Sequence, residues 1–317
     1  MELRRVAFFL AFTLVVSSGA VAFATTYLSM ATGSPSGVYY PVGRAIGGLI
    51  TKYLQNVVVN VEVSTASVSN CEAVGKHAVD LALVQNNVAT WAYTGRYMFR
   101  EKAIKNLRAI ATLYPEAIQI VTLKGRGINT ITDLVGKRVS IGLPGSGTSI
   151  DAVSVLRLCG VKMEDLKLYH LSFSETTRRI EDGKIDAGFV TAGYPTASIM
   201  NLAAHKNIEL VSIPEEMIEK IHLDYPYYVR IVIPKGTYKG LVHDVTTVSC
   251  MAMLVVNAAL SERLVYDITK TMWEHIKDIY SVHEKAKYIT LKTALDGLSI
   301  PLHRGAERYY EEKGMLK

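Results

Sequence analysis

Two short loops rich in glycine and hydroxyl side chains are the segments of this sequence best suited to bind a ligand. TGSPSG occupies residues 32–37 and PGSGTS occupies residues 144–149, and each lies between a strand-like run and a helix-like pattern. In open α/β sheets, ligands bind where such loops lead from the carboxyl end of a strand into a helix. Unpaired backbone N–H groups and the helix dipole at that point favour an anion such as a carboxylate or phosphate.

The second loop nearly matches a phosphate-binding motif. In GLPGSGTS, residues 142–149, the spacing of Gly142, Gly147 and Ser149 fits the pattern GxxxxGK[ST], but Thr148 stands at the lysine position. Without the lysine, the charge that steadies terminal phosphates is missing. Nucleotide hydrolysis is therefore disfavoured, whereas binding of a small anion is still expected.

The loop side chains have two possible roles. Gly145 and Gly147 would let the main chain approach a ligand closely, while Ser146, Thr148 and Ser149 offer hydroxyl groups. One hydroxyl is expected to serve only as the N-cap of the following helix. For any single serine or threonine here, capping and ligand contact are both open.

Neutral polar or small residues also follow other predicted strands in both halves of the chain. A polar turn would explain each set by itself, but together they are expected to meet at one cleft and to bind a small polar ligand. The predicted ligand-binding residues are Ser34, Ser36, Gly37, Tyr39, Tyr40, Thr65, Ser67, Asn70, Gln85, Gly145, Ser146, Gly147, Thr148, Ala192, Gly193 and Tyr194.

Signatures of catalysis are missing from the sequence. It contains no HExxH, CxxC or GxSxG motif, and Pro35 stands where GSPSG would need a nucleophile. The eight histidines are scattered without metal-ligand spacing. Cys71, Cys159 and Cys250 are far apart and are expected to be buried small hydrophobic residues, although one pair could oxidise. We expect no catalytic residue, no metal and no cofactor.

The elements that position these loops alternate between strand-like and helix-like patterns, which indicates an α/β fold. Two stretches repeat one plan of glycine loop, helix, strand, glycine–aspartate and strand. The predicted elements are strands at 27–31, 57–63 and 139–143, a helix at 39–54 and a second helix that follows the loop at 144–149 and runs through about Leu158. Gly75 and Asp80 belong to the first repeat, and Gly183 and Asp186 belong to the second.

No flexible linker separates the two halves. The strand-like run at residues 109–123 spans their boundary, and a second crossing is expected at residues 248–256. We therefore predict lobe 1 from residues 25–115 plus 248–317 and lobe 2 from residues 116–247. A helix after the second crossing carries an apolar stripe of Leu264, Val265, Ile268, Met272 and Ile276, which we expect to be core.

The N-terminus has the pattern of an export signal. Arg4 and Arg5 precede an apolar run over residues 6–16, and Ala22-Phe23-Ala24 resembles a cleavage site, so residues 1–24 are predicted to be a signal peptide cleaved after Ala24. A retained anchor is the alternative, but the apolar run is shorter than the roughly 20 residues of a membrane span. The chain has a net charge of +6 without a basic run interleaved with aromatics, so nucleic acid is not an expected partner.

Several blocks of this sequence resemble the TAXI solute receptors, the extracytoplasmic binding subunits of one branch of TRAP transporters. The blocks are TGSPSGVYYPVG (32–43), VDLALVQNNVA (79–89), LRAIATLYPEAIQIV (107–121), GKRVSIGLPGSGTS (136–149), LSFSE (171–175), IDAGFVTAGYP (185–195), IPKGTY (233–238) and PLHRGAERYY (301–310). The sequence departs from the family pattern at Pro35, Ser36 and Val38 in the first loop and at Arg304 in the last block.

The resemblance implies a type II periplasmic-binding-protein fold, with two doubly wound lobes joined by crossing strands and a ligand cleft between them. It further implies a small anionic or zwitterionic ligand such as glutamate, glutamine or a 2-oxoacid, delivered by a periplasmic monomer to integral-membrane TRAP permease subunits. Two alternatives stay open on the same fold. One is a periplasmic enzyme using Cys71, and the other is a ligand-sensing subunit.

Overall fold

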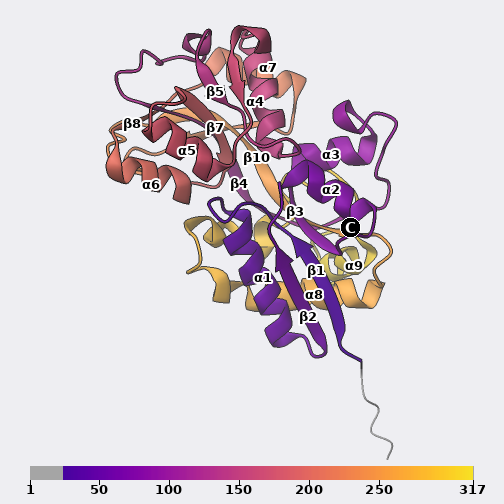
Figure 1. The fold of residues 1–317 in the computed structure, drawn as a ribbon. Coiled ribbons are helices and arrows are strands. Elements are labelled where there is room, and N and C mark those ends of the chain that lie inside the picture. The colour runs from indigo at the N-terminus through magenta and orange to yellow at the C-terminus, as the bar shows by residue number, and fades with distance from the viewer. Residues whose placement is uncertain (1–23, 317) are drawn as a thin grey trace, which may run out of the picture.

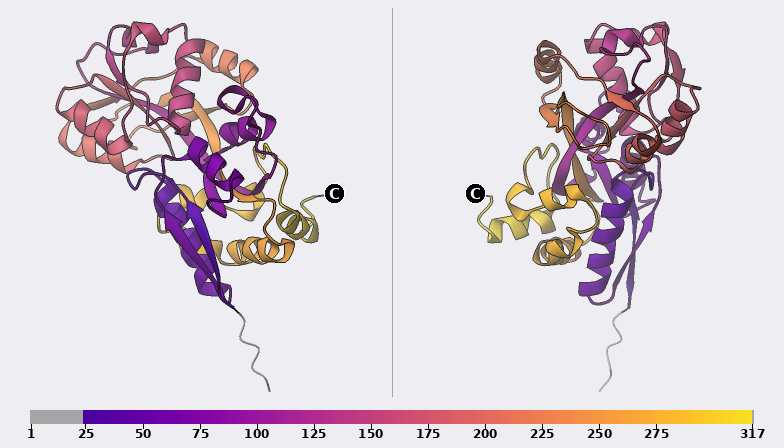
Figure 2. Two further views of the ribbon diagram at one scale, coloured as in Figure 1. Left: turned by 45° about the vertical axis from the view of Figure 1, so that its right-hand side comes forward. Right: turned by 90° about the vertical axis from the view of Figure 1, so that its left-hand side faces the viewer.

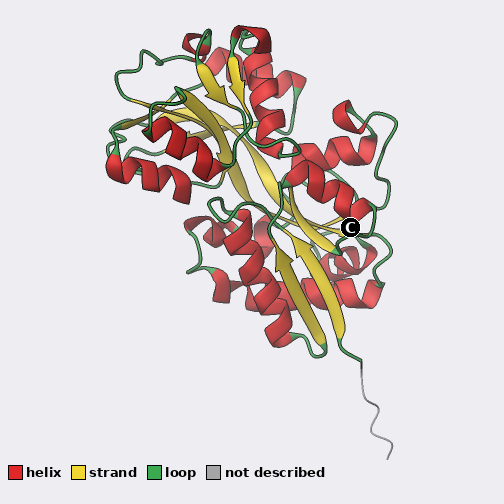
Figure 3. Ribbon diagram, in the orientation of Figure 1, coloured by secondary structure: helices red, strands yellow, loops and turns green. Residues whose placement is uncertain are grey.

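The computed structural model describes residues 24–316, which form two lobes around one continuous sheet (Figure 1). The predicted signal peptide lies outside the described residues, except for Ala24. Helices cover both faces of the sheet in each lobe (Figure 3). The predicted α/β class and the two-lobed type II periplasmic-binding fold are confirmed.

The first lobe begins with three parallel strands and their connecting helices. The strands lie in the order β2-β1-β3, and α1 packs against β2 while α2 packs against β3. Apolar residues spaced along α1, such as Val42, Ile46 and Leu49, face the core and are buried. The elements are β1 Thr26–Ala31, α1 Tyr39–Tyr53, β2 Val57–Glu62, α2 Ser67–Gly75, β3 Leu81–Gln85 and α3 Asn86–Thr94.

The second lobe repeats this arrangement. Its first three strands lie in the order β6-β5-β7, so the second strand of the repeat is again outermost and the first is between the other two. The elements are β5 Arg138–Ser140, α4 Gly147–Leu158, β6 Lys167–Tyr169, α5 Phe173–Glu181 and β7 Ala187–Ala192, followed by α6 Ala197–His205, β8 Ile208–Leu210, α7 Glu215–Asp224 and β9 Val229–Ile233.

The aspartate at the end of each repeat has the same structural role in both lobes. The Asp80 carboxylate accepts a hydrogen bond from the backbone N–H of Ser29 in β1 at 2.8 Å, and Asp186 accepts one from Arg138 N–H in β5, also at 2.8 Å. Each aspartate thereby fixes its incoming strand to the first strand of the repeat. The recurring glycine–aspartate pattern therefore marks a strand junction, as the sequence indicated.

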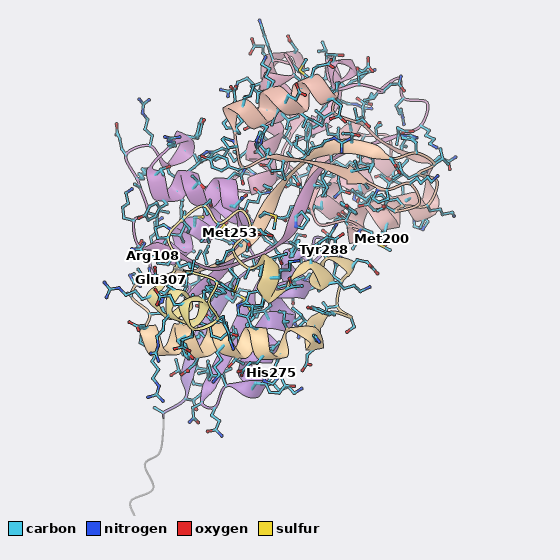
Figure 4. All side chains as sticks on the ribbon, turned by 180° about the vertical axis from the view of Figure 1, so that it is seen from behind. Arg108, Met200, Met253, His275, Tyr288 and Glu307 are labelled. Atoms are coloured by element: carbon cyan, nitrogen blue, oxygen red, sulfur yellow. The ribbon has the colours of Figure 1, made fainter. Side chains whose placement is uncertain are left out.

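Two long strands connect the lobes. β4, Leu107–Leu123, and β10, Val245–Asn257, pair antiparallel in the middle of the sheet, between β3 and β7. Figure 2 shows them running from one lobe into the other, and Figure 4 places Met253 of β10 between the lobes. Their pairing register shifts between Met251 and Met253, beside the middle of β4. These strands are the crossings that the sequence predicted.

The C-terminal segment returns to the first lobe. In α8, Glu262–His275, the residues Val265, Ile268 and Met272 are fully buried, and α8 packs against α1 and against α9, Arg304–Glu312. The predicted apolar stripe is therefore core. Among the helices of residues 24–316, none is both long and apolar enough to cross a membrane.

Candidate functional site

A cavity of about 550 Å³, including the open space at its mouth, lies where the two lobes meet. Both glycine loops contribute to its wall, together with polar residues at the ends of β2, β3 and β7. The predicted residues that line it are Ser34, Gly37, Tyr39, Thr65, Ser67, Gln85, Ser146, Gly147, Thr148 and Ala192.

Four helices begin at the cavity wall. Tyr39 starts α1, Ser67 starts α2, Gly147 starts α4 and Phe173 starts α5, and all four residues line the cavity. The first N–H groups of a helix have no intrahelical partner, and the helix dipole places partial positive charge there. This convergence favours an anionic group in the cavity. No lysine or arginine is among the described residues that line it.

The helix N-termini of the two glycine loops differ in how they are capped. Val38 precedes α1 and provides no side-chain cap, so the first N–H groups of α1 are left to face the cavity. In contrast, Ser146 Oγ accepts a hydrogen bond from Ser149 N–H at 3.1 Å and thereby caps α4. Ser146 is thus the capping hydroxyl expected from the sequence, and Gly147 and Thr148 contribute backbone N–H groups.

The start of α2 contacts the opposite lobe directly. The Gly145 carbonyl accepts hydrogen bonds from Val68 N–H at 3.1 Å and from Ser69 N–H at 3.2 Å. Gly145 has a φ of +78°, which glycine adopts readily. Ala66 at the N-cap of α2 has a φ of 74° and a ψ of −147°, a conformation that is costly for a residue with a Cβ. Backbone strain and an interlobe contact therefore meet at this wall.

Glu116 of β4 forms the only carboxyl group among the described residues that line the cavity. Its side chain is 2% exposed, and Tyr39 donates a hydrogen bond from its hydroxyl to Oε2 at 2.7 Å. Burial raises the pKa of Glu116 well above its ordinary value, and the Tyr39 hydrogen bond opposes that rise. Glu116 is positioned by the crossing strand, opposite Cys250 of β10.

A second buried carboxyl, Asp151 of α4, lies behind the wall. Its oxygens accept hydrogen bonds from Gln85 Nε2 at 2.8 Å, Asn87 Nδ2 at 3.0 Å and the Tyr228 hydroxyl at 2.6 Å. Burial raises the pKa of Asp151, and these donors oppose the rise. Gln85 lines the cavity, and its Oε1 is buried without a hydrogen-bond partner in the described chain.

Some predicted ligand-binding residues do not line the cavity, and each has another role. Ser36 bonds through its hydroxyl to Ser34 and accepts Ser198 N–H at its carbonyl, and Tyr40 lies against the Arg44 guanidinium. Asn70 donates to the Thr32 and Leu83 carbonyls, both at 2.7 Å. Gly145 forms the interlobe contact described above.

Gly193 and Tyr194 belong to a separate buried contact. Tyr194 places its ring 3.4 Å from the ammonium of Lys285, which is also 4.5 Å from the ring of Tyr288, labelled in Figure 4. A Cβ at Gly193 would lie 2.6 Å from Lys285 Cγ, so glycine makes room for the lysine stem. Burial lowers the pKa of Lys285 to about 8. These two residues support the lysine, behind the cavity.

Other lining residues were outside the predicted ligand-binding set. Glu116 lies in a long apolar run, where one charged residue was the available signal. Phe173 contributes an apolar wall, since its ring lies 3.2 Å from the position of a Cβ at Gly37. The polar strand ends that were expected at the cleft also contribute Ser64, Ala66 and Thr191. The remaining lining residues are Gly33, Val38, Leu143, Leu171 and Ser172.

None of the three cysteines of the described residues lines the cavity. Cys71 and Cys250 are completely buried, and burial raises the pKa of each thiol well above its ordinary value. Cys159, the third free cysteine, is also buried, and its pKa is raised to about 11. Within residues 24–316 no group of histidine, cysteine and carboxylate side chains could hold a metal ion. The arrangement is suited to holding a small ligand.

The sequence and fold are similar to known proteins. A putative L-cystine ABC transporter from Listeria monocytogenes has a TM-score of 0.51 and 13% identity, covering 85% of this chain and 98% of its own. PhnD1 from Prochlorococcus marinus, in complex with methylphosphonate, has a TM-score of 0.54 and 12% identity, covering 92% of this chain and 99% of its own. The sequence matches the NMT1-like family over residues 30–314, which is nearly the whole described chain, and the protein therefore belongs to that family.

Proposed function

We propose that this protein is an extracytoplasmic solute-binding protein that closes two lobes around a small carboxylate and delivers it to a membrane permease without catalysis. The observation that carries the proposal is the meeting of four helix N-termini at one interlobe cavity with no lysine or arginine in its described lining. Such a site stabilises a carboxylate through the helix dipoles and through backbone N–H groups that have no other partner, since Val68 and Ser69 of α2 already donate to the Gly145 carbonyl. The candidate ligands are glutamate, glutamine and the 2-oxoacids.

Several parts of the proposal concern the cellular role. The protein is exported with residues 1–24 removed, acts in the periplasm and is a monomer, so that both lobes are accessible to the permease. The hinge lies in β4 and β10, which gives lobe 1 as residues 25–115 plus 248–317 and lobe 2 as residues 116–247. Light scattering that showed a stable dimer at low micromolar concentration would contradict the monomer.

The class of transporter that receives the ligand can be proposed from the sequence blocks and from the similar structures. The TAXI-like sequence blocks favour a TRAP-type permease driven by an ion gradient. An ABC permease is the second candidate, because the Listeria monocytogenes structure of similar fold carries that name. Uptake into vesicles that contain the permease separates them: a requirement for ATP would support the ABC type, and uptake driven by an ion gradient alone would support the TRAP type.

A thermal-shift screen tests the ligand class. Binding to the native state alone raises its stability by RT ln(1 + [L]/Kd), which is about 2.7 kcal/mol at a hundredfold excess over Kd. We expect amino acids, dicarboxylates or 2-oxoacids to raise the melting temperature, with alkanesulfonates, phosphonates and neutral sugars as comparison sets. Stabilisation by sugars alone would contradict the proposed carboxylate site.

Closure is tested independently by small-angle scattering. Only a closed form contacts a ligand from both lobes, so ligand should shift the protein toward the smaller radius of gyration. In the structure, Val68 and Ser69 of lobe 1 donate backbone hydrogen bonds to the Gly145 carbonyl of lobe 2, so the two lobes are in direct contact. An unchanged radius of gyration at saturating ligand would count against closure.

A further inference from the structure

Glu116 is a buried acid on a wall that otherwise favours anions. Tyr39 supplies its one hydrogen bond, to Oε2, and no donor of the described residues bonds to Oε1. The titratable groups around Glu116 are Tyr39, Tyr114, Asp151 and Cys250, and none of these carries positive charge. An ionised Glu116 therefore lacks a countercharge from the protein.

A further buried acceptor oxygen in the cavity wall lacks a partner. Gln85 Oε1 is buried without a hydrogen bond in the described chain, and Gln85 lines the cavity together with Glu116. Buried polar atoms of this kind are normally satisfied, so this oxygen points to a group supplied by a ligand. A ligand ammonium carries three N–H donors and a positive charge, which fits acceptors beside a carboxyl group.

The helix N-termini and Glu116, which both border the cavity, together restrict the charges that a ligand can carry. Helix N-termini favour a negative group and disfavour a cation, while Glu116 favours a positive group. A simple cation satisfies only Glu116, and a simple dicarboxylate satisfies only the helix N-termini. A zwitterion satisfies both.

We propose that Glu116 binds the ammonium group of an α-amino acid and is the specificity-determining residue that selects amino acids over matching 2-oxoacids and 2-hydroxyacids. This inference rests on the proposed function and narrows its ligand class. The ligand carboxylate lies toward the free N–H groups of α1 and α4, and its ammonium lies toward Glu116.

Matched ligands that differ only at the α-carbon test the inference by isothermal titration of the purified protein, freed of co-purified ligand by dialysis. One set is glutamate, 2-oxoglutarate and 2-hydroxyglutarate, and a second is alanine, pyruvate and lactate. The amino acid of the set that binds should bind about 10- to 100-fold more tightly than its two partners. Glu116→Gln, which keeps the side-chain shape, should reduce this preference to within about threefold.

A matched control removes an equivalent charge away from the site. Glu72→Gln changes an exposed carboxylate on α2 that pairs with Lys76 at 3.7 Å, and it should leave both affinity and preference unchanged. Near-ultraviolet circular dichroism checks that each variant is folded. If Glu116→Gln fails to fold, the ranking of the three matched ligands by the parent protein still decides the question.

The outcomes separate this inference from the proposed function. Equal or tighter binding of the 2-oxoacid or 2-hydroxyacid by the parent would overturn the role of Glu116 while retaining a carboxylate site. An equal loss of affinity for all three ligands in Glu116→Gln would overturn it too. If no carboxylate binds and another solute class does, both the proposed function and the inference fail.

Discussion

Asp151 and Glu116 are both buried carboxyls at the interlobe site, but their surroundings differ. Asp151 lies behind the wall, where Gln85, Asn87 and Tyr228 donate to its two oxygens. Glu116 lines the cavity and receives a single hydrogen bond, from Tyr39. Burial alone therefore does not identify a ligand-binding acid. An acid whose oxygens are satisfied supports structure, whereas one with an open oxygen in a cavity is available to a ligand.

The largest effect is expected when Asp151 is removed. Asp151→Ala would leave Gln85 Nε2 and the Tyr228 hydroxyl without an acceptor, whereas Asn87 Nδ2 would still donate to the Tyr228 hydroxyl at 2.9 Å. Each unsatisfied group costs about 1–3 kcal/mol. Since removal of a desolvated carboxyl offsets part of this, we expect the free energy of unfolding to fall by about 3 kcal/mol in urea denaturation.

Asp151→Asn is the matched control. Its amide can keep an acceptor for Tyr228 and Asn87, and rotation of the Gln85 amide would present the unpaired Oε1 to the new N–H group. We expect a loss of about 1 kcal/mol or less. If Asp151→Ala is as stable as Asp151→Asn, the three hydrogen bonds do not support the fold as described.

A smaller loss of stability is expected when a side chain is added at Gly147, next to the Gln85 amide that bonds Asp151. A Cβ at Gly147 would collide with Oε1 of the Gln85 amide, whose Nε2 donates to Asp151. Gly147→Ala should therefore lower the free energy of unfolding by about 2 kcal/mol, as overpacking does, and weaken ligand binding. Gly48→Ala is the control, because a Cβ there meets no atom within 4 Å. Equal stability of the two variants in thermal denaturation would contradict close packing at Gly147.

The protonation of Glu116 and Asp151 can be probed without a substitution by measuring how the free energy of unfolding depends on pH. Burial raises the folded pKa of Glu116 above that of the unfolded chain, where an ordinary value of 4.5 applies. The folded state then keeps a proton that the unfolded state releases, so the free energy of unfolding falls as pH rises from about 5. The limiting slope is about 1.4 kcal/mol per pH unit for one group.

The difference between the parent and Glu116→Gln isolates this contribution. Asp151 has a raised pKa in both proteins, and the lowered pKa values of His283 and His303 act in the opposite direction in both. Urea denaturation of the ligand-free proteins between pH 5 and pH 8 should show the steeper decline in the parent. Parallel curves would indicate that Glu116 is ionised throughout this range.

The smallest effect is expected at the single hydrogen bond of Glu116. Tyr39→Phe removes the donor to Oε2 and should lower the free energy of unfolding by about 1 kcal/mol. Tyr40→Phe, one residue further along α1 and outside the cavity lining, should change it by less than 0.5 kcal/mol. A larger loss at Tyr40 than at Tyr39, measured by thermal denaturation, would contradict this assignment.

The repeated plan of the two lobes could be predicted from the amino-acid sequence. Glycine loops, amphipathic helices and β-branched strands are local patterns, so β1, α1 and β2 could be predicted with nearly the observed bounds. The two glycine–aspartate junctions were also visible, because Asp80 and Asp186 act on strands of their own repeat. Loop residues such as Gly147 and Thr148 were expected to face a ligand because they start a helix after a strand.

Which of these polar residues line the cavity depends on how the two lobes pack in three dimensions. Asn70 and Tyr194 are residues of a type that often binds ligands. In this structure, however, the Asn70 amide donates to two backbone carbonyls, and the Tyr194 ring packs against the Lys285 ammonium. Glu116 lies in an apolar strand, and its place in the cavity follows from the crossing of β4 between the lobes. Whether a buried acid is satisfied depends on partners distant in sequence, as with Asp151 and Tyr228, and such pairing is fixed by packing and not by local pattern.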